Sequence, residues 1–144
     1  MSRSTHADWK QLAAELKIEG RAFIDGAYRH ADDERRFDCV NPATGAKLAD
    51  IAHCGEADVN KAVKAARRAF ESGVWSSLPP IKRGGILKRF AALIREHADE
   101  LALLETLDAG KPIGDTTSVD VPAAAHCVEW YAESIDKIGG EVAP

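Results

Sequence analysis

At Glu56 the spacing of the apolar residues changes from the period of strands to that of helices, and this change constrains the fold more than any other feature. Before Glu56, short β-prone segments alternate with turn residues, a pattern typical of strands. After Glu56, apolar side chains recur every three or four residues, which is the period of an amphipathic helix. The sequence therefore predicts two short β-hairpins followed by three or four helices.

Turn residues place the two hairpins. Asp25-Gly26 stands between two short β-prone segments, and such a pair favours a two-residue turn whose central positions both need positive φ. A second antiparallel pair is predicted at Arg36–Val40 and Lys47–Ala52, joined by Asn41-Pro42-Ala43-Thr44-Gly45. An amphipathic helix over Asp8–Leu16 precedes both hairpins.

Three helical segments follow, each with recognisable end signals. Their expected bounds are Glu56 to Gly73, Pro79 to Asp108 with a break near His97–Asp99, and Asp120 to Lys137 with Pro122 in the first turn. An apolar stripe that includes Val59, Val63 and Phe70 is expected on one face of the first of them. In the last helix we expect the buried face to hold Ala124, Cys127, Tyr131, Ile135 and Ile138.

Composition excludes several classes of function. The chain has 144 residues and a formal net charge of -4, and its 19 Lys and Arg are spread among 23 Asp and Glu. Without a basic stripe, no nucleic-acid partner is expected. No apolar run approaches the roughly 20 residues that cross a bilayer, and the polar start lacks the features of a signal peptide. We therefore expect one soluble cytoplasmic unit without a membrane partner.

The residues themselves predict no self-contained catalytic site. Cys39, Cys54 and Cys127 form no Cys-x-x-Cys pair, which argues against zinc or disulfides and for a reducing compartment. Cys127 lies on the apolar stripe of the last helix, so a buried structural thiol is favoured over a nucleophile. The chain contains no Gly-x-Gly, which the fingerprint of dinucleotide-binding folds requires.

Three sequence blocks, in their order and spacing, carry a resemblance to a known family. They are Phe23-Ile24-Asp25-Gly26, Val40-Asn41-Pro42-Ala43-Thr44-Gly45 and Leu104-Glu105-Thr106-Leu107-Asp108-Ala109-Gly110-Lys111-Pro112. From Trp9 to Pro144 the chain resembles the amino-terminal quarter of the NAD(P)-dependent aldehyde dehydrogenases. Trp9 and the segment 130–137 are most similar to the branch that oxidises γ-glutamyl-γ-aminobutyraldehyde in putrescine breakdown.

The resemblance implies an α/β family fold, of which this segment is a mainly helical part with two short β-hairpins. It places an N-terminal helix and lead-in at 1–20 and the first part of the coenzyme-binding domain at 21–144, truncated before the Rossmann-like core and the catalytic domain. In this family a cysteine thiolate attacks the aldehyde, hydride passes to NAD or NADP, and a glutamate activates water. Those groups and the main coenzyme contacts lie beyond the position that matches Pro144, so the chain alone is expected to be inactive.

The resemblance also implies that the intact enzyme takes a small aldehyde and is a homo-oligomer, a dimer or a tetramer. A different class of function remains open, in which the chain is a non-catalytic helical module that binds a partner. The surface that the missing sheet would otherwise cover would then form the contact. Faces that the missing sheet would cover are expected to be exposed if the chain folds alone.

The resemblance also names two candidate sites, neither of them catalytic or coenzyme-binding. Asp120, Ala123 and Cys127 would line the aldehyde entrance tunnel, although Ala123 and Cys127 could equally be core residues. A monovalent cation would be held by the backbone carbonyls of Cys39 and Val40 and by the Asp108 carboxylate. Alternatively, Asp108 is a helix-end residue that accepts backbone N–H groups from the Gly110 turn.

Overall fold

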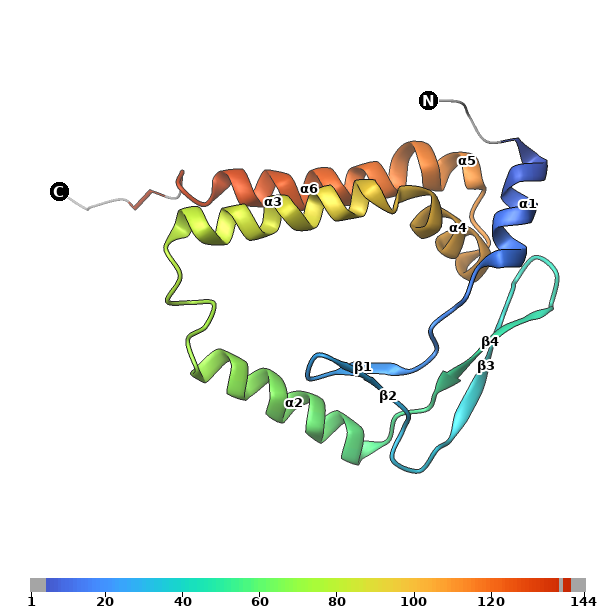
Figure 1. Ribbon diagram of the computed structural model, residues 1–144, viewed down its shortest axis with the longest axis horizontal. Helices are drawn as coiled ribbons and strands as arrows, with labels where there is room; N and C mark the ends of the chain where they lie inside the picture. The colour runs from blue at the N-terminus through green and yellow to red at the C-terminus, as the bar shows by residue number, and fades with distance from the viewer. Residues whose placement is uncertain (1–4, 138, 141–144) are drawn as a thin grey trace.

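The computed structural model describes residues 5–137 together with 139 and 140, and it consists of helices and two separate two-stranded sheets (Figure 1). The elements in chain order are α1 (His6–Glu15), β1 (Ala22–Ile24), β2 (Ala27–Arg29), β3 (Arg36–Val40), β4 (Lys47–Ala52), α2 (Glu56–Glu71), α3 (Pro80–Glu96), α4 (Ala98–Ala109), α5 (Ile113–Asp115), the π-helical turn η1 (Thr116–Asp120) and α6 (Val121–Ser134). Across these residues, no helix is long and apolar enough to cross a membrane.

Both predicted hairpins are confirmed. In the first, Asp25 and Gly26 have φ values of 56° and 75°, as a turn with two left-handed central residues requires. In the second, β3 pairs antiparallel with β4, and its bounds match the predicted strands residue for residue. A register shift between Cys39 and Val40 bends the end of β3 just before the Asn-Pro turn.

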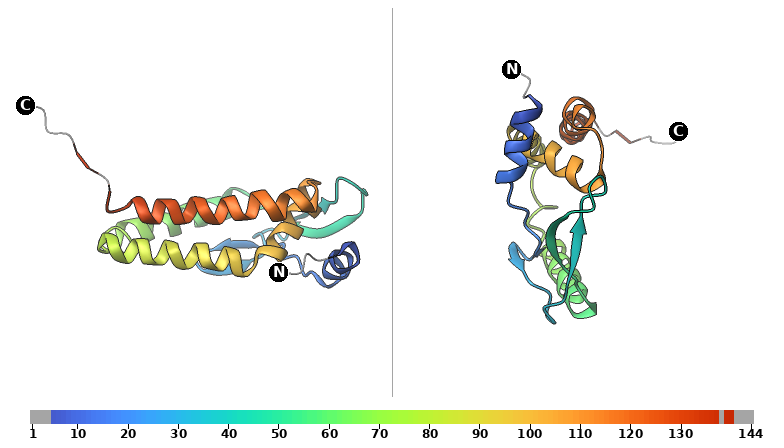
Figure 2. Two further views of the ribbon diagram at one scale, coloured as in Figure 1. Left: turned by 90° about the horizontal axis from the view of Figure 1, so that it is seen from above. Right: turned by 90° about the vertical axis from the view of Figure 1, so that its right-hand side faces the viewer.

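The small core lies where α3, α4, η1 and α6 meet. Figures 1 and 2 show α3 and α6 running side by side, with α4 against one end of the pair. The buried side chains are mostly small: Ala91 and Ala102 are fully covered, as are Thr116 and Ala125. At Gly84 the two helices approach so closely that an added Cβ would lie 3.0 Å from the Ala132 carbonyl oxygen.

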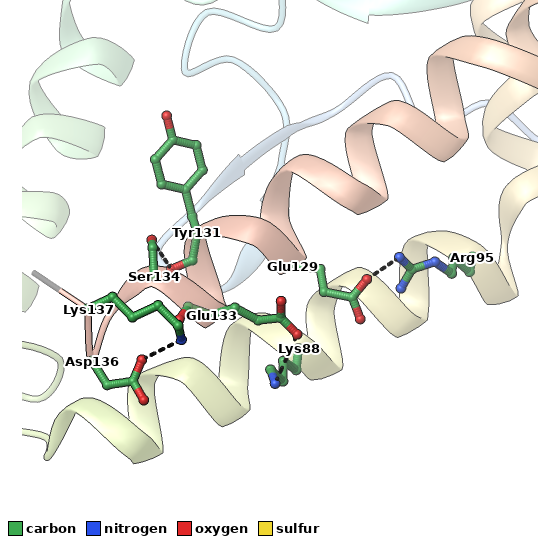
Figure 3. A network of polar contacts seen from close by, with 8 residues as sticks. All are labelled: Lys88, Arg95, Glu129, Tyr131, Glu133, Ser134, Asp136 and Lys137. Atoms are coloured by element: carbon green, nitrogen blue, oxygen red, sulfur yellow. Dashed lines mark hydrogen bonds and ion pairs between the residues drawn. The ribbon is translucent and has the colours of Figure 1, made fainter.

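Ion pairs close the outer edge of this helix pair, as Figure 3 shows. The Arg95 guanidinium of α3 lies 2.5 Å from the Glu129 carboxylate of α6, and Lys88 Nζ lies 3.4 Å from Glu133 Oε1. All four side chains are at least one-third exposed, so each pair contributes little to stability on its own. Both pairs link α3 to α6 along the same edge.

The predicted stripe of α2 is not buried in this chain. Figure 1 shows α2 apart from the α3–α6 pair, with the β1–β2 hairpin beside it, and the loop after β2 contacts its first turns. Val59, Val63 and Phe70 are 53%, 59% and 71% exposed. The helix itself was predicted correctly from Glu56 to Gly73, because its period and end signals are local. Burial of the apolar stripe depends on other elements that pack against it, and no described element covers the stripe of α2.

The last helical run begins earlier than predicted. Instead of starting at Asp120, it opens at Ile113 with α5, widens in η1 and continues as α6. The Val121 N–H donates to the Thr116 carbonyl, five residues back, and Pro122, which has no N–H, follows this wide turn. The Thr117 and Ser118 hydroxyls donate to the carbonyls of 113 and 114, so these residues join a helix that their propensities disfavour.

The buried face of α6 was also predicted wrongly. Val121, Ala125 and Ala132 face the core, whereas Ala124, Cys127 and Tyr131 are exposed. Because α6 packs closely on α3, mostly small side chains fit between the two helices. The predicted face instead included the large side chains of Tyr131 and Ile135. Ile135 is half-buried, and Ile138 lies outside the described residues. Within α3 and α4, the predicted break near His97 is confirmed.

Candidate functional site

The first candidate site lies where the turn after β3 meets the end of α4. The Cys39 thiol donates a hydrogen bond to Asp108 Oδ1 across 3.0 Å, although 69 positions separate the two residues. One turn further on, Gly110 has a φ of 75° and ends α4, and a Cβ there would lie 2.9 Å from the Pro42 ring. The structure therefore brings the residues Cys39 and Asp108 together, through the Cys39 thiol and not through the backbone carbonyl that the predicted cation site would use.

The electrostatics of this contact keep Cys39 protonated. The hydrogen bond to Asp108 raises the pKa of the Cys39 thiol, and partial burial and the carboxylate charge add to the effect. A thiol with a raised pKa is a poor nucleophile at neutral pH, so Cys39 is unsuited to attack a carbonyl. The Gly110 N–H donates to the Thr106 carbonyl, so the alternative in which this turn binds the Asp108 carboxylate is not what the structure shows.

The side chains around Asp108 form no cluster of metal ligands, since among the described residues no three His, Cys, Asp or Glu side chains lie close enough together to hold a metal ion. Any ion at Asp108 would therefore depend on backbone carbonyls, such as those of Cys39 and Val40. Oxygen donors of this kind suit hard cations.

The second candidate site lies at the start of α6. Lys111 Nζ lies 2.5 Å from Asp120 Oδ2, so an ion pair joins the turn after α4 to the last residue of η1. Pairing with Asp120 raises the pKa of Lys111, and the charges of Asp115 and Glu105 add to the effect. Both paired side chains are half-buried. Asp120 therefore has a fixed position and a cationic partner.

The three predicted tunnel residues share one side of the helical run. Ala123 follows Asp120 by three residues, and Cys127 follows Ala123 by four, which places them in successive turns. Ala123 and Cys127 are exposed, and the neighbouring face with Val121 and Ala125 packs into the core. Of the two alternatives for Ala123 and Cys127, burial in the core of this chain is thus contradicted. Their place in a tunnel remains a prediction.

Two aromatic residues extend this exposed side of α6, and the sequence analysis did not assign them to a site. Trp130 and Tyr131 stack edge to face with ring centroids 5.0 Å apart, and both are more than half exposed. Figure 3 shows the Tyr131 ring projecting away from the ion pairs of the α3–α6 seam. The spacing from Cys127 to Tyr131 was recognised, but it was interpreted as a core stripe.

A buried carboxylate caps the N-terminus of α2. Asp58 accepts the backbone N–H groups of Gly55 and Asp32 at 3.0 and 3.1 Å, and it is only 4% exposed. Asp58 therefore joins the start of α2 to the loop between β2 and β3.

Comparison with known proteins identifies the family. The family model described as the aldehyde dehydrogenase family matches residues 28–144. NADP/NAD-dependent aldehyde dehydrogenase PuuC of Escherichia coli K12 is 49% identical over 95% of this chain and 28% of its own length. The aminoacetaldehyde dehydrogenase of Pseudomonas aeruginosa is 47% identical over the same shares.

Solved structures agree with this result. The crystal structure of γ-glutamyl-γ-aminobutyraldehyde dehydrogenase from Burkholderia cenocepacia is 70% identical, with a TM-score of 0.93 over 96% of this chain and 28% of that one. Indole-3-acetaldehyde dehydrogenase of Pseudomonas syringae, solved with NAD+, is 52% identical with a TM-score of 0.95. The chain spans little more than a quarter of the length of these relatives, at their amino-terminal end. With its sequence and its fold both matched, the chain belongs to the aldehyde dehydrogenase family.

Proposed function

We propose that this chain supplies the first part of the coenzyme-binding domain, residues 21–144 with a lead-in helix at 1–20, to an enzyme that oxidises an aldehyde to a carboxylic acid with NAD(P)+. The observation that carries this proposal is the match in sequence and fold to several aldehyde dehydrogenases over nearly all of the chain. In this proposal the intact enzyme is a cytoplasmic homo-oligomer, and the chain alone is inactive. The thiolate, the catalytic base and the main coenzyme contacts come from the rest of the enzyme.

The proposed substrate is γ-glutamyl-γ-aminobutyraldehyde. Its support is the 70% identity to the Burkholderia cenocepacia dehydrogenase of that name, against 52% for the indole-3-acetaldehyde dehydrogenase. The test is a set of kcat/KM values for the intact dehydrogenase with γ-glutamyl-γ-aminobutyraldehyde, aminoacetaldehyde and indole-3-acetaldehyde. We expect the first to be highest. A higher value for either of the others would overturn the proposed substrate and leave the reaction type in place.

In the same proposal, the exposed side of α6 forms one wall of the tunnel through which the aldehyde enters. Asp120, Ala123 and Cys127 would line it, since they lie in successive turns and both Ala123 and Cys127 are exposed. The small side chain at Ala123 leaves room for an extended aldehyde. Asp120 adds a half-buried carboxylate at one end of this wall.

A monovalent cation at Asp108 is a further part of the proposal. The Asp108 carboxylate and the carbonyls of Cys39 and Val40 would hold it, and its role would be structural, because it would join the β3 turn to α4. The test compares melting temperatures of the intact dehydrogenase and its Asp108→Ala variant in KCl and in tetramethylammonium chloride. We expect K+ to stabilise only the unmodified enzyme. An equal response of the variant would exclude Asp108 as a ligand.

A second candidate function is that of a helical interaction module, and the exposed stripe of α2 favours it. Val59, Val63 and Phe70 lie on one side of α2, and Arg67 stacks over the Phe70 ring. Exposed apolar surface of this kind typically contacts another protein surface. If the chain works alone, it should be a monodisperse, sharply melting monomer by light scattering and calorimetry. If it is part of the enzyme, the isolated chain should self-associate.

A further inference from the structure

Asp120 has a charged neighbour that affects what its carboxylate can attract. Lys111 Nζ lies 2.5 Å from Asp120 Oδ2, and the side chains of Lys111 and Asp120 are 42% and 33% exposed. Lys111 belongs to the short turn between Gly110 and Pro112, and Asp120 ends η1. The pair therefore ties the first turns of the helical run back to the end of α4.

The backbone on both sides of the pair restrains its geometry. Gly110 ends α4 in the left-handed conformation, and Pro112 has a fixed φ, so the base of the Lys111 side chain has little freedom. On the other side, the buried Thr116 hydroxyl bonds to the Thr106 hydroxyl at 3.0 Å, which anchors η1 on α4. Asp120 is consequently held by a turn that is fixed to α4, and Lys111 lies in the turn that directly follows α4.

The net charge of the site follows from this contact. Asp120 alone would present a negative charge beside Ala123, and such a charge would attract a cationic aldehyde. Lys111 offsets that charge at ion-pair distance. Asp115 and Glu105 also act on Lys111, and they lie on α5 and α4 respectively.

We propose that Lys111 is a positioning and specificity-determining residue, which holds Asp120 in place and lowers the preference of the tunnel for cationic aldehydes. This inference rests on the proposed function, because it needs Asp120 to lie in the aldehyde tunnel. It adds a residue that the tunnel assignment did not include. In this proposal, the ion pair between η1 and the turn after α4 sets the net charge near Asp120.

Two variants of opposite charge effect test the proposal in the intact dehydrogenase. The substrates are aminoacetaldehyde, which is cationic at neutral pH, and propanal, a neutral aldehyde of the same heavy-atom count. The measured quantity is the ratio of their kcat/KM values. Lys111→Met should raise this ratio by about threefold or more through KM, because it frees the Asp120 charge. Asp120→Asn should lower it, because it leaves the Lys111 charge unpaired.

Matched variants separate charge from damage to the fold. Lys111→Arg should keep the ratio close to that of the unmodified enzyme, since a guanidinium can also pair with Asp120. Lys61→Met removes a lysine of an exposed ion pair with Asp32, far along the chain, and should leave the ratio unchanged. The double variant Lys111→Met/Asp120→Asn should return the ratio toward its original value. The rise in Lys111→Met should also shrink at high salt.

The outcomes distinguish this inference from the proposed function. If Lys111→Met leaves the ratio unchanged or lowers it while Asp120→Asn changes KM, the tunnel assignment stands and the role of Lys111 is wrong. If Lys111→Met, Asp120→Asn and a bulky substitution at Ala123 all leave every KM unchanged, the tunnel assignment fails and the inference fails with it.

Discussion

The thiol of Cys39 donates a hydrogen bond to the carboxylate of Asp108 across 3.0 Å, and this contact joins the β3–β4 hairpin to the end of α4. Without it, the hairpin would depend at this end on the packing of Pro42 against Gly110. The first contact joins the end of β3 to the last turn of α4, and the second joins the turns that follow them. These contacts explain why two short motifs far apart in the sequence act as one structural unit.

The raised pKa of Cys39 predicts slow alkylation. At pH 8, Cys39 should react with iodoacetamide several-fold more slowly than the exposed thiols Cys54 and Cys127, because less of it is thiolate. Asp108→Ala should remove most of the difference. Peptide mass spectrometry of timed samples measures each rate, and equal rates for all three thiols would contradict the contact.

The raised pKa of Cys39 also predicts how the stability of the folded chain changes at high pH. The pKa of Cys39 is higher in the folded chain than in the unfolded chain, so its stabilising contribution is complete below the unfolded-state pKa. That contribution is lost as the pH rises through the folded-state pKa. The melting temperature should therefore fall less steeply between pH 8 and 11 in Cys39→Ala than in the unmodified chain. Parallel curves would show that Cys39 is not coupled to folding.

The α3–α6 contact predicts opposite effects for two neighbouring glycines. Gly84→Ala places a Cβ 3.0 Å from the Ala132 carbonyl and should lower the free energy of unfolding by about 1 kcal/mol or more, since the helices must separate. Gly85→Ala meets nothing within 4 Å and should raise it by up to about 1 kcal/mol through helix propensity. Urea unfolding followed by circular dichroism measures both. Equal effects would show that α6 does not pack at Gly84.

A second glycine pair tests the turn beside Asp108. Gly110 has a φ of 75° and lies against Pro42, so Gly110→Ala should destabilise the chain by about 1 kcal/mol or more. Gly114→Ala lies in α5 with open space around it and serves as the control. If the control destabilises the chain as much as Gly110→Ala does, neither the strain nor the Pro42 contact is responsible.

The sequence predicted the hairpins and most helix bounds because their signals are local. Asp25-Gly26 selects its turn by conformation alone, and the period of α2 needs no partner to be recognised. The face of α6 could not be predicted in this way. It depends on how closely α3 approaches at Gly84, and the π-helical turn before Pro122 depends on hydroxyl groups that usually oppose a helix.

In the candidate sites too, the sequence predicts what has a local signal and misses contacts between distant residues. Cys39 and Asp108 were linked only through the family resemblance, since no spacing rule connects residues so far apart. The Lys111–Asp120 pair was missed altogether. Its members are nine positions apart, across a turn and a widened helix, where neither helical nor strand spacing places side chains together.

The chain by itself is expected to bind NAD negligibly and to oxidise no aldehyde. The sequence contains no Gly-x-Gly to hold a pyrophosphate, and the hydrogen bond to Asp108 raises the pKa of the Cys39 thiol. Calorimetric titration with NAD+ and a turnover assay with several aldehydes measure this. Saturable binding at micromolar concentrations would overturn it.

The effect of Ala123→Leu in the intact dehydrogenase tests directly whether this segment lines the path of the aldehyde. If the exposed side of α6 lines the aldehyde tunnel, the larger side chain should raise KM for γ-glutamyl-γ-aminobutyraldehyde much more than KM for acetaldehyde. The conservative control is Ala57→Leu, at an exposed position in the first turn of α2, which should change neither value. Equal effects of Ala123→Leu on both aldehydes would contradict the proposal that this segment forms part of the substrate path.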